Sequence, residues 1–302
     1  MNVFTGECIH VSLPILRRRH VLGLTAGDGL LVLCRKVGVD TVQLLNPFTR
    51  ELVDLPDATT LTYNPEGFRA LSAAVTDDST VVLHHRRCSV AVAKPLDERW
   101  TQLKLKDTIM STTLFAGRFY CATAKNILEV ELETMAGQPP RVEVAADYYQ
   151  VDGGVAPCDL LRLVDNGGEL TLAHRLHAPY GDPRHGKCKV YRVDLYQGKV
   201  ELVPRLGGRA VLIGGDDSDR VLSVPASVSP AIGADTVYIC DCYDEEAGQV
   251  KSVACHRLDG SIEDGCRRKR PCSILDSLSC YVAAYRVEMD SSYPNPIRIR
   301  IR

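Results

Sequence analysis

The chain has 302 residues, a net charge of −2 and an isoelectric point near 6.4. This mildly acidic balance argues against functions that need a strongly basic surface, such as nucleic-acid binding. No apolar run approaches the roughly 18 residues of a membrane-spanning helix, and residues 1–10 do not resemble a secretory signal. We therefore expect a protein of the cytoplasm or nucleus that contacts no membrane.

The first predicted elements are short strands separated by turn residues. An isolated strand at 7–13 precedes basic residues 17–20, which are expected to form a loop. Three strands follow at 30–35, 41–45 and 51–55. Strands of about five residues, with turn chemistry every 8–12 residues, are typical of an all-β meander.

The same pattern recurs four more times, in segments that start near residues 68, 108, 159 and 208. The strands predicted in these segments are 70–75, 80–84, 89–93, 101–105, 112–115, 117–122, 127–132, 141–144, 159–164, 169–174, 188–194, 199–203, 210–213, 236–240 and 250–256. Repeats of roughly 40–50 residues match the period of a propeller blade.

We predict an all-β fold, a β-propeller of about six blades of antiparallel strands that is closed by pairing of the N- and C-terminal strands. The propeller is expected to be a single domain at 1–290, followed by a tail or edge strand at 291–302. Residues 275–285 fit a helix or a strand equally well. Two β-sandwiches of about 150 residues each are the alternative fold, although no linker rich in Gly, Ser or Pro separates two halves.

Twelve cysteines are present, and several stand inside strand-like apolar runs, such as Cys34, Cys121 and Cys240. Cysteine behaves there as a small apolar residue. Because a chain of this length needs no covalent staples, we expect reduced cysteines and an intracellular location.

Three patterns could carry cofactor chemistry. Residues 181–188, GDPRHGKC, have the spacing of a phosphate-binding loop, but a cysteine replaces its Ser or Thr and the following residues favour a strand. A His-x₂-His and His-x₂-Cys set could hold Zn²⁺, and it comprises His174, His177, His185 and Cys188. Cys240 and Cys242 share one strand face without a second ligand pair. For all three we favour ordinary loop or strand roles, and we predict no cofactor and no metal.

No catalytic motif is recognisable, and paired acidic residues such as those at 77–78, 216–217 and 245–246 fall in turn-like segments. We therefore predict that the protein is not an enzyme. Two alternatives stay open: an enzyme or ligand-binding propeller with a site in the central channel, and a zinc-stabilised domain. The basic run 266–271, CRRKRP, could be a nuclear import signal or a solvated loop.

Three blocks resemble plant F-box-associated proteins whose large domain is a KIB-type β-propeller, formerly a domain of unknown function. They are NPFTRELVDLP at 46–56, LGGRAVLIG at 206–214 and the step DTVYI at 235–239, which acidic residues follow. The resemblance covers about residues 5–260, and the order and spacing of the blocks are its specific part. The matched residues are Asn46, Pro47, Thr49, Leu55, Pro56, Gly207, Gly208, Arg209, Gly214 and Tyr238.

For these residues we favour structural roles. Asn46, Pro47 and Pro56 would shape turns, and Gly207 and Gly208 would allow positive φ or close strand packing. Arg209 is expected to pair with an acidic residue across a blade.

The resemblance implies a domain that recognises substrates for a ubiquitin ligase. Family members carry an N-terminal F-box that docks an adaptor of a cullin ligase, but residues 1–28 show no pattern of an amphipathic helical bundle. Binding of that adaptor is therefore not expected. The family's aromatic-rich C-terminal close is also hard to find after Arg267. We predict a monomeric, non-catalytic propeller that binds a protein partner on one face, with the loop 174–188 as a candidate contact.

Overall fold

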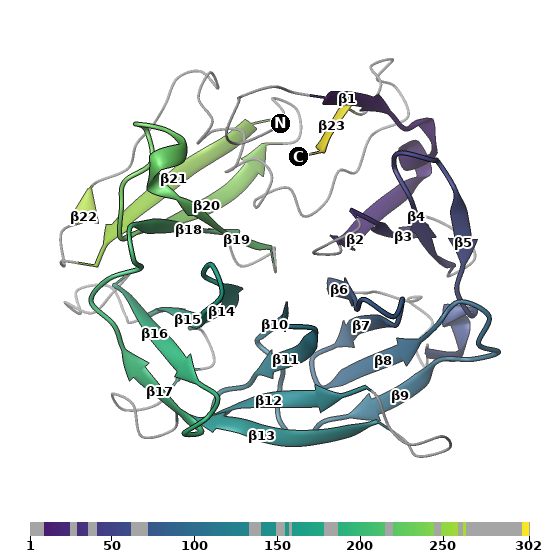
Figure 1. The fold of residues 1–302 in the computed structure, drawn as a ribbon, viewed down its shortest axis with the longest axis horizontal. Coiled ribbons are helices and arrows are strands. Elements are labelled where there is room, and N and C mark those ends of the chain that lie inside the picture. The colour runs from purple at the N-terminus through teal and green to yellow at the C-terminus, as the bar shows by residue number, and fades with distance from the viewer. Residues whose placement is uncertain are drawn as a thin grey trace.

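The computed structural model is a ring of small sheets around a central axis (Figure 1). It describes residues 9–24, 29–35, 41–61, 72–132, 140–148, 155–156, 159–177, 187–214, 220–244, 249–258, 262–263 and 298–301. No helix within these ranges is long and apolar enough to cross a membrane. The ring confirms the predicted all-β propeller, and no pair of sandwiches is present in the described part of the chain.

Four blades each contain four antiparallel strands, in chain order from the centre outward (Figure 1). Blade 1 consists of β2 (Arg19–Leu24), β3 (Leu31–Arg35), β4 (Val42–Leu45) and β5 (Leu52–Asp54). Blade 2 consists of β6 (Ser72–Val75), β7 (Val81–Arg86), β8 (Ser89–Ala93) and β9 (Thr101–Lys104). Blade 3 consists of β10 (Ser111–Phe115), β11 (Arg118–Ala122), β12 (Asn126–Glu131) and β13 (Arg141–Asp147). Blade 4 consists of β14 (Leu160–Asp165), β15 (Leu170–Arg175), β16 (Cys188–Asp194) and β17 (Lys199–Leu202).

Blade 5 departs from this order. Its strands are β18 (Arg209–Gly214), β19 (Val221–Pro225), β20 (Thr236–Asp244), β21 (Gln249–Arg257) and β22 (Ile262–Glu263), and they lie in the order β19-β18-β20-β21-β22. The chain enters as the second strand, turns back as the innermost strand, and then pairs β20 in parallel with β18. The blade is therefore not purely antiparallel, in contrast to the prediction from sequence.

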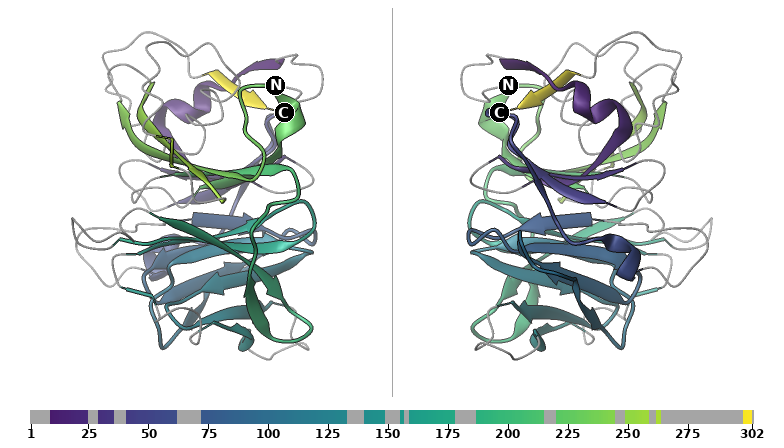
Figure 2. Two further views of the ribbon diagram at one scale, coloured as in Figure 1. Left: turned by 90° about the vertical axis from the view of Figure 1, so that its left-hand side faces the viewer. Right: turned by 90° about the vertical axis from the view of Figure 1, so that its right-hand side faces the viewer.

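The two ends of the chain meet between blade 5 and blade 1. The first strand, β1 (Ile9–Ser12), pairs antiparallel with the last, β23 (Arg298–Ile301), and Figure 2 shows the two side by side in both views. Nearer the axis, the Arg220 guanidinium donates a hydrogen bond of 3.1 Å to the carbonyl of Val21. The described part of the chain also contains three short 3₁₀ helices: η1 (Pro14–Arg18), η2 (Ala58–Leu61) and η3 (Ala226–Val228).

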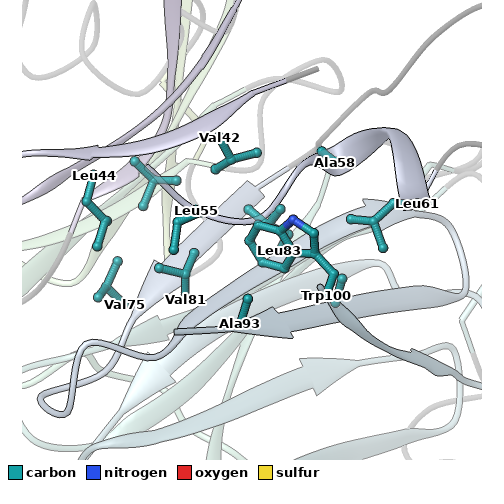
Figure 3. Packing of buried hydrophobic residues seen from close by; sticks show 12 residues of the cluster. Val42, Leu44, Leu55, Ala58, Leu61, Val75, Val81, Leu83, Ala93 and Trp100 are labelled. Atoms are coloured by element: carbon teal, nitrogen blue, oxygen red, sulfur yellow. The ribbon is translucent and has the colours of Figure 1, made fainter. Parts of the chain in front are cut away.

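The core lies between neighbouring blades. Middle strands such as β8 are buried on both faces, which explains why their sequences are continuous apolar runs instead of alternating ones. Figure 3 shows the contact of blades 1 and 2, where the Trp100 ring lies among side chains that include Leu61 and Leu83. The indole N–H donates a hydrogen bond of 2.7 Å to the carbonyl of Pro56. This contact joins the end of blade 1 to the last hairpin of blade 2.

Three described strands were missed by the sequence patterns: β2, β19 and the two-residue β22 at the outer end of blade 5. The first two are innermost strands. Residues 17–20 were expected to form a basic loop, but η1 ends at Arg18 and β2 begins at Arg19. Strand β19 has no strong alternation and was not predicted. Innermost strands of a propeller border the channel, so they do not need the apolar faces that mark the middle strands.

Because consecutive strands of a blade are antiparallel, the second turn of a blade and the link to the next blade lie at the same end. Among the described residues of blades 3 and 4 this end is formed by 105–110, 123–125, 155–156, 159 and 176–177, which we call the link face. Hydrogen bonds connect its segments: Met110 N–H donates to the carbonyl of Ala122, and Tyr148 N–H donates to that of Lys125. The predicted partner loop 174–188 starts from this face, but residues 174–175 belong to β15 and Cys188 to β16. Residues 178–186 lie outside the described residues.

Candidate functional site

The strongest polar arrangement on the link face is a buried carboxylate–imidazole pair. Asp159 stands directly before β14, and His174 stands near the end of the neighbouring strand β15. The distance from His174 Nε2 to Asp159 Oδ2 is 2.8 Å, and both side chains are buried. Asp159 also accepts backbone N–H bonds from Ala156, at 2.9 Å, and from His177, at 2.8 Å.

This set, which we call the Asp159 clasp, fixes two segments of the link face to each other. Burial by itself raises the pKa of Asp159, but the hydrogen bonds from His177 N–H, His174 and Ala156 N–H outweigh it, so the pKa lies below its usual value. The carboxylate is therefore ionised at neutral pH. The aromatic ring of Tyr191 packs near His174, with 6.4 Å between ring centroids.

The histidine and cysteine set that was considered as an alternative zinc site is not brought together. In the β15–β16 ladder His174 is opposite Lys189, whereas Cys188 is opposite Arg175. Successive residues of a strand point to opposite faces, so His174 and Cys188 lie on different sides of blade 4 and cannot share one tetrahedral ion. His177 is tied to Asp159 through its backbone, and His185 lies outside the described residues.

The other chemical patterns gain no support from the geometry. Strand β16 begins at Cys188, as expected for the residues after the sequence that resembles a phosphate loop, so no helix N-terminus follows its Gly-Lys pair. Most of residues 181–188 lie outside the described ranges. The side chains of Cys240 and Cys242 and the basic run 266–271 also lie outside them. Five cysteines are described, and all are free thiols: Cys34, Cys88, Cys121, Cys188 and Cys255. Burial raises the pKa of Cys188 to about 12, so this thiol is protonated at neutral pH.

The first family-like block forms the turn between β4 and β5. Asn46 Oδ1 accepts the backbone N–H groups of Phe48, at 2.9 Å, and Thr49, at 3.1 Å, which is an Asx turn. Thr49 Oγ1 accepts the N–H of Glu51, and Pro47 is buried beneath the turn. The polar residues of this block therefore satisfy backbone groups of the turn itself.

The end of the same block forms the contact between blades 1 and 2. Leu55 is buried in the core that these blades share, and the carbonyl of Pro56 accepts the Trp100 hydrogen bond. The two residues thus position one blade against the next.

The second block forms the turn before β18. Gly207 and Gly208 have φ angles of +66° and +75°, a region that L residues with a Cβ rarely adopt. Asp235, just before β20, accepts the N–H of Leu206 at 2.6 Å and that of Gly208 at 3.3 Å. One carboxylate therefore fixes the turn, and it comes from the same block of sequence as Tyr238.

Arg209 joins blade 4 to blade 5. Its guanidinium donates to the hydroxyl of Ser223, at 2.9 Å, and to the Ser223 carbonyl. The Ser223 hydroxyl donates in turn to Asn166 Oδ1, at 2.7 Å, in the first hairpin turn of blade 4. The expectation that Arg209 pairs with an acidic residue is therefore wrong among the described residues, where Arg209 binds the hydroxyl and carbonyl of Ser223.

Gly214 and Tyr238 complete the matched residues. Gly214 ends β18, and its N–H donates to the carbonyl of Arg220 across the hairpin. Tyr238 is buried in blade 5, and its hydroxyl accepts the N–H of Gly233 at 2.7 Å. All ten matched residues thus lie in turns or at contacts within and between blades, and none joins the Asp159 clasp.

Comparison with family models gives one match, the KIB1-4 β-propeller, over residues 2–259. The chain belongs to the KIB1-4 β-propeller family. The matched range includes the three blocks at 46–56, 206–214 and 235–239. No curated protein sequence matches the chain.

Solved structures similar to this KIB1-4 propeller are distant. The Dos1 propeller is 6% identical, with 91% of this chain and 78% of that chain covered and a TM-score of 0.41. Sqt1 of Saccharomyces cerevisiae is 12% identical, with 88% and 65% covered and a TM-score of 0.38. The Cps50 (Swd1) propeller domain of Myceliophteria thermophila is 8% identical, with 88% and 89% covered and a TM-score of 0.37.

Replacing Gly208 with alanine should destabilise this KIB1-4 propeller through its backbone alone. A Cβ at Gly208 would meet nothing within 4 Å, so the cost is that of a positive φ, about 1–2 kcal/mol. Gly208→Asn should cost less, because asparagine tolerates this region. Urea denaturation of both variants checks this, and equal losses would contradict a conformational cause.

Between blades 4 and 5 lies a buried histidine. His256, on β21, is 6% exposed, and neither ring nitrogen has a hydrogen-bond partner among the residues that the structure describes. Burial, and then the positive charge of Arg175, lower its pKa below the usual 6.5. The folded state therefore holds a neutral imidazole.

This imidazole should make the folded state sensitive to mild acid. Below pH 6.5 the His256 imidazole becomes protonated in the unfolded chain but stays neutral in the folded chain. The free energy of unfolding therefore decreases as the pH falls toward the lowered pKa. His256→Leu should be neutral or up to about 2 kcal/mol stabilising, with its advantage larger at pH 5.5 than at pH 7.5. His256→Gln should remove the pH effect without removing the unpaired polar group. Thermal unfolding at both pH values measures this, and a constant difference would contradict it.

Sequence reasoning missed the Asp159 clasp. It considered His174 only as one member of an unfavoured zinc set, and it placed Asp159 at the start of the strand 159–164. One signal was available: His174 follows Leu170 and Leu172 at the alternate positions of a strand, which favours a buried side chain. Most buried polar side chains have a hydrogen-bond partner. The identity of the partner could not be predicted from sequence, because it is the register of β14 against β15 that brings Asp159 next to His174.

Proposed function

We propose that this KIB1-4 propeller is a non-catalytic recognition domain that binds a protein partner through the loops of its link face. The observation that carries the proposal is the Asp159 clasp, which fixes the segments around 156–159 and 174–177 to rigid strands. Recognition surfaces are commonly loops held by a rigid scaffold. The role would correspond to the substrate-recognition half of an F-box ubiquitin-ligase receptor, as in the plant proteins that the chain resembles.

The proposal can be tested by comparing captured partners. We expect the full chain, immobilised at low density, to retain a partner from a plant extract that is lost when residues 178–186 are replaced by Gly and Ser. Gln102→Glu, on the outer strand of blade 2, serves as the matched control and should keep the partner. Capture that is equal for all three proteins would contradict a link-face site.

A second measurement separates recognition from ligase recruitment. We expect no binding between this chain and the purified adaptor of a cullin ubiquitin ligase in surface plasmon resonance. Robust binding of the adaptor would contradict a recognition-only role. We further propose a monomer of the cytoplasm or nucleus, which sedimentation velocity and cell fractionation can check.

A catalytic channel is the competing proposal, and the observations favour it less. Within the described ranges, no group of three or more His, Cys, Asp or Glu side chains is arranged so that it could hold a metal ion. Arg162, on the innermost strand of blade 4, is buried and donates to the carbonyls of Leu161 and of Met110 in blade 3. Turnover of chromogenic esters, phosphates or glycosides that is lost in His174→Ala would contradict the non-catalytic proposal.

A further inference from the structure

The outermost strand of blade 3 is unlike those of the other four-stranded blades. Strand β13 has seven residues, whereas β5, β9 and β17 have three or four. On its outer side, β13 pairs with β17 at Asp147, which is opposite Lys199. No described strand pairs with the outer side of residues 141–146. A long free edge is a template for another strand, which is why natural sheets keep such edges short, charged or covered.

This edge also carries exposed apolar side chains. Val142 and Val144 are 37% and 59% exposed, while the exposed residues of β9 are all polar. The exposure of the two valines follows from a register shift in the β12–β13 ladder, where Ile127 is opposite Ala146 but Leu128 is opposite Val144. Ala146 therefore points into the core of blades 3 and 4, while Val142 and Val144 lie on the other face of the sheet. Tyr196, 98% exposed, stands in the turn whose Gly198 carbonyl accepts the N–H of Asp147.

Glu143, which lies between the two valines, has no positively charged partner among the described residues. Glu143 is directly opposite Glu129 in the β12–β13 ladder. Glu129 is compensated, since it accepts bonds from Arg118 at 2.7 Å and from the Tyr120 hydroxyl at 3.2 Å. Glu143 is exposed and forms no hydrogen bond or ion pair with any described residue. Like charges opposite each other destabilise a ladder, so a cation next to Glu143 would relieve it.

We propose that the outer edge of β13 is a docking site for an extended segment of a partner protein in which a lysine or arginine stands between two β-branched residues. The added strand would pair its backbone with the free edge and place its apolar side chains beside Val142 and Val144. Its basic residue would lie opposite Glu143. This site is on the rim of the ring, so it does not depend on the link-face proposal.

The chain's own end has the same pattern, Arg-Ile-Arg-Ile at 298–301, but this strand is paired with β1. Exchange of that strand onto a second copy would disrupt the pairing of the two ends. A separate partner protein is therefore the favoured occupant, and self-association is an outcome that the test must distinguish.

The test uses the full chain and a fluorescent peptide, Ser-Thr-Val-Lys-Val-Thr-Ser, followed by anisotropy. We expect this peptide to bind at least about tenfold more tightly than the same peptide with glutamate in place of lysine, a difference of about 1.4 kcal/mol. Glu143→Lys should reverse the preference. Lys104→Glu, on the outer strand β9, is the matched control and should leave it unchanged.

In the anisotropy experiment, equal binding of both peptides, or a preference for lysine that survives Glu143→Lys, would overturn the proposal. Hydrogen exchange of the unmodified chain gives a second readout that needs no variant, because bound peptide should slow exchange at 141–145. Unchanged exchange there would also overturn it. Sedimentation velocity that shows dimers, lost on deletion of 298–302, would assign the edge to a second copy and reject a separate partner.

Discussion

Replacing Trp100 with alanine is expected to lower the free energy of unfolding by about 3–5 kcal/mol. The ring is buried where blades 1 and 2 meet, and its removal leaves a cavity beside Ala58, Leu61 and Leu83 (Figure 3). It also leaves the carbonyl of Pro56 without its hydrogen bond. Trp100→Phe should keep most of the packing and cost about 1–3 kcal/mol, the penalty for an unsatisfied buried carbonyl.

Urea denaturation followed by far-ultraviolet circular dichroism measures this effect. Fluorescence is unsuitable because Trp100 is the only tryptophan. Leu96→Ala is the matched control. Leu96 lies in the same connection between β8 and β9 and is 97% exposed, so its replacement should change the free energy of unfolding by no more than about 0.5 kcal/mol. A Trp100→Ala loss no larger than that of the control would show that this contact does not hold the two blades together.

Asp159→Ala should be similarly destabilising, by about 3–5 kcal/mol, because it leaves a buried histidine and two backbone N–H groups without their acceptor. Asp159→Asn should cost less, since the amide oxygen can still accept one of these bonds. Asp165→Asn is the matched control. That residue is exposed and accepts only the N–H of Gly168, so the expected loss is below about 1 kcal/mol.

The acid dependence of the Asp159 variants gives an independent check. The pKa of Asp159 is lowered in the folded state, so the unfolded chain takes up a proton first as the pH falls. The stability that the carboxylate contributes is complete above the unfolded pKa of about 3.8. It is lost as the pH falls through the folded value. The difference between the unmodified chain and Asp159→Asn should therefore shrink below pH 3.8, and a constant difference would contradict an ionised clasp.

Local patterns were sufficient for the middle strands of each blade. Residues 89–93 and 188–194 have the predicted bounds, because continuous apolar runs or clean alternation between turn residues mark such strands. The innermost strands β2 and β19 carried no such signal, since they border the channel. The order of strands in blade 5 could not be predicted either, because it depends on β20 pairing with β18 and not with β19, which precedes β20 in the chain.

The sequence by itself determined the repeat of short strands, the turn residues that separate them and the blocks that mark the KIB1-4 family. These are local properties, set by backbone preference and alternation within a few residues. Only the tertiary structure decided that Asp159 meets His174, that Arg209 meets Ser223 in place of an acid, and that His174 and Cys188 face opposite sides. Each of these depends on strand register, which places residues that are distant in sequence on one face or on two.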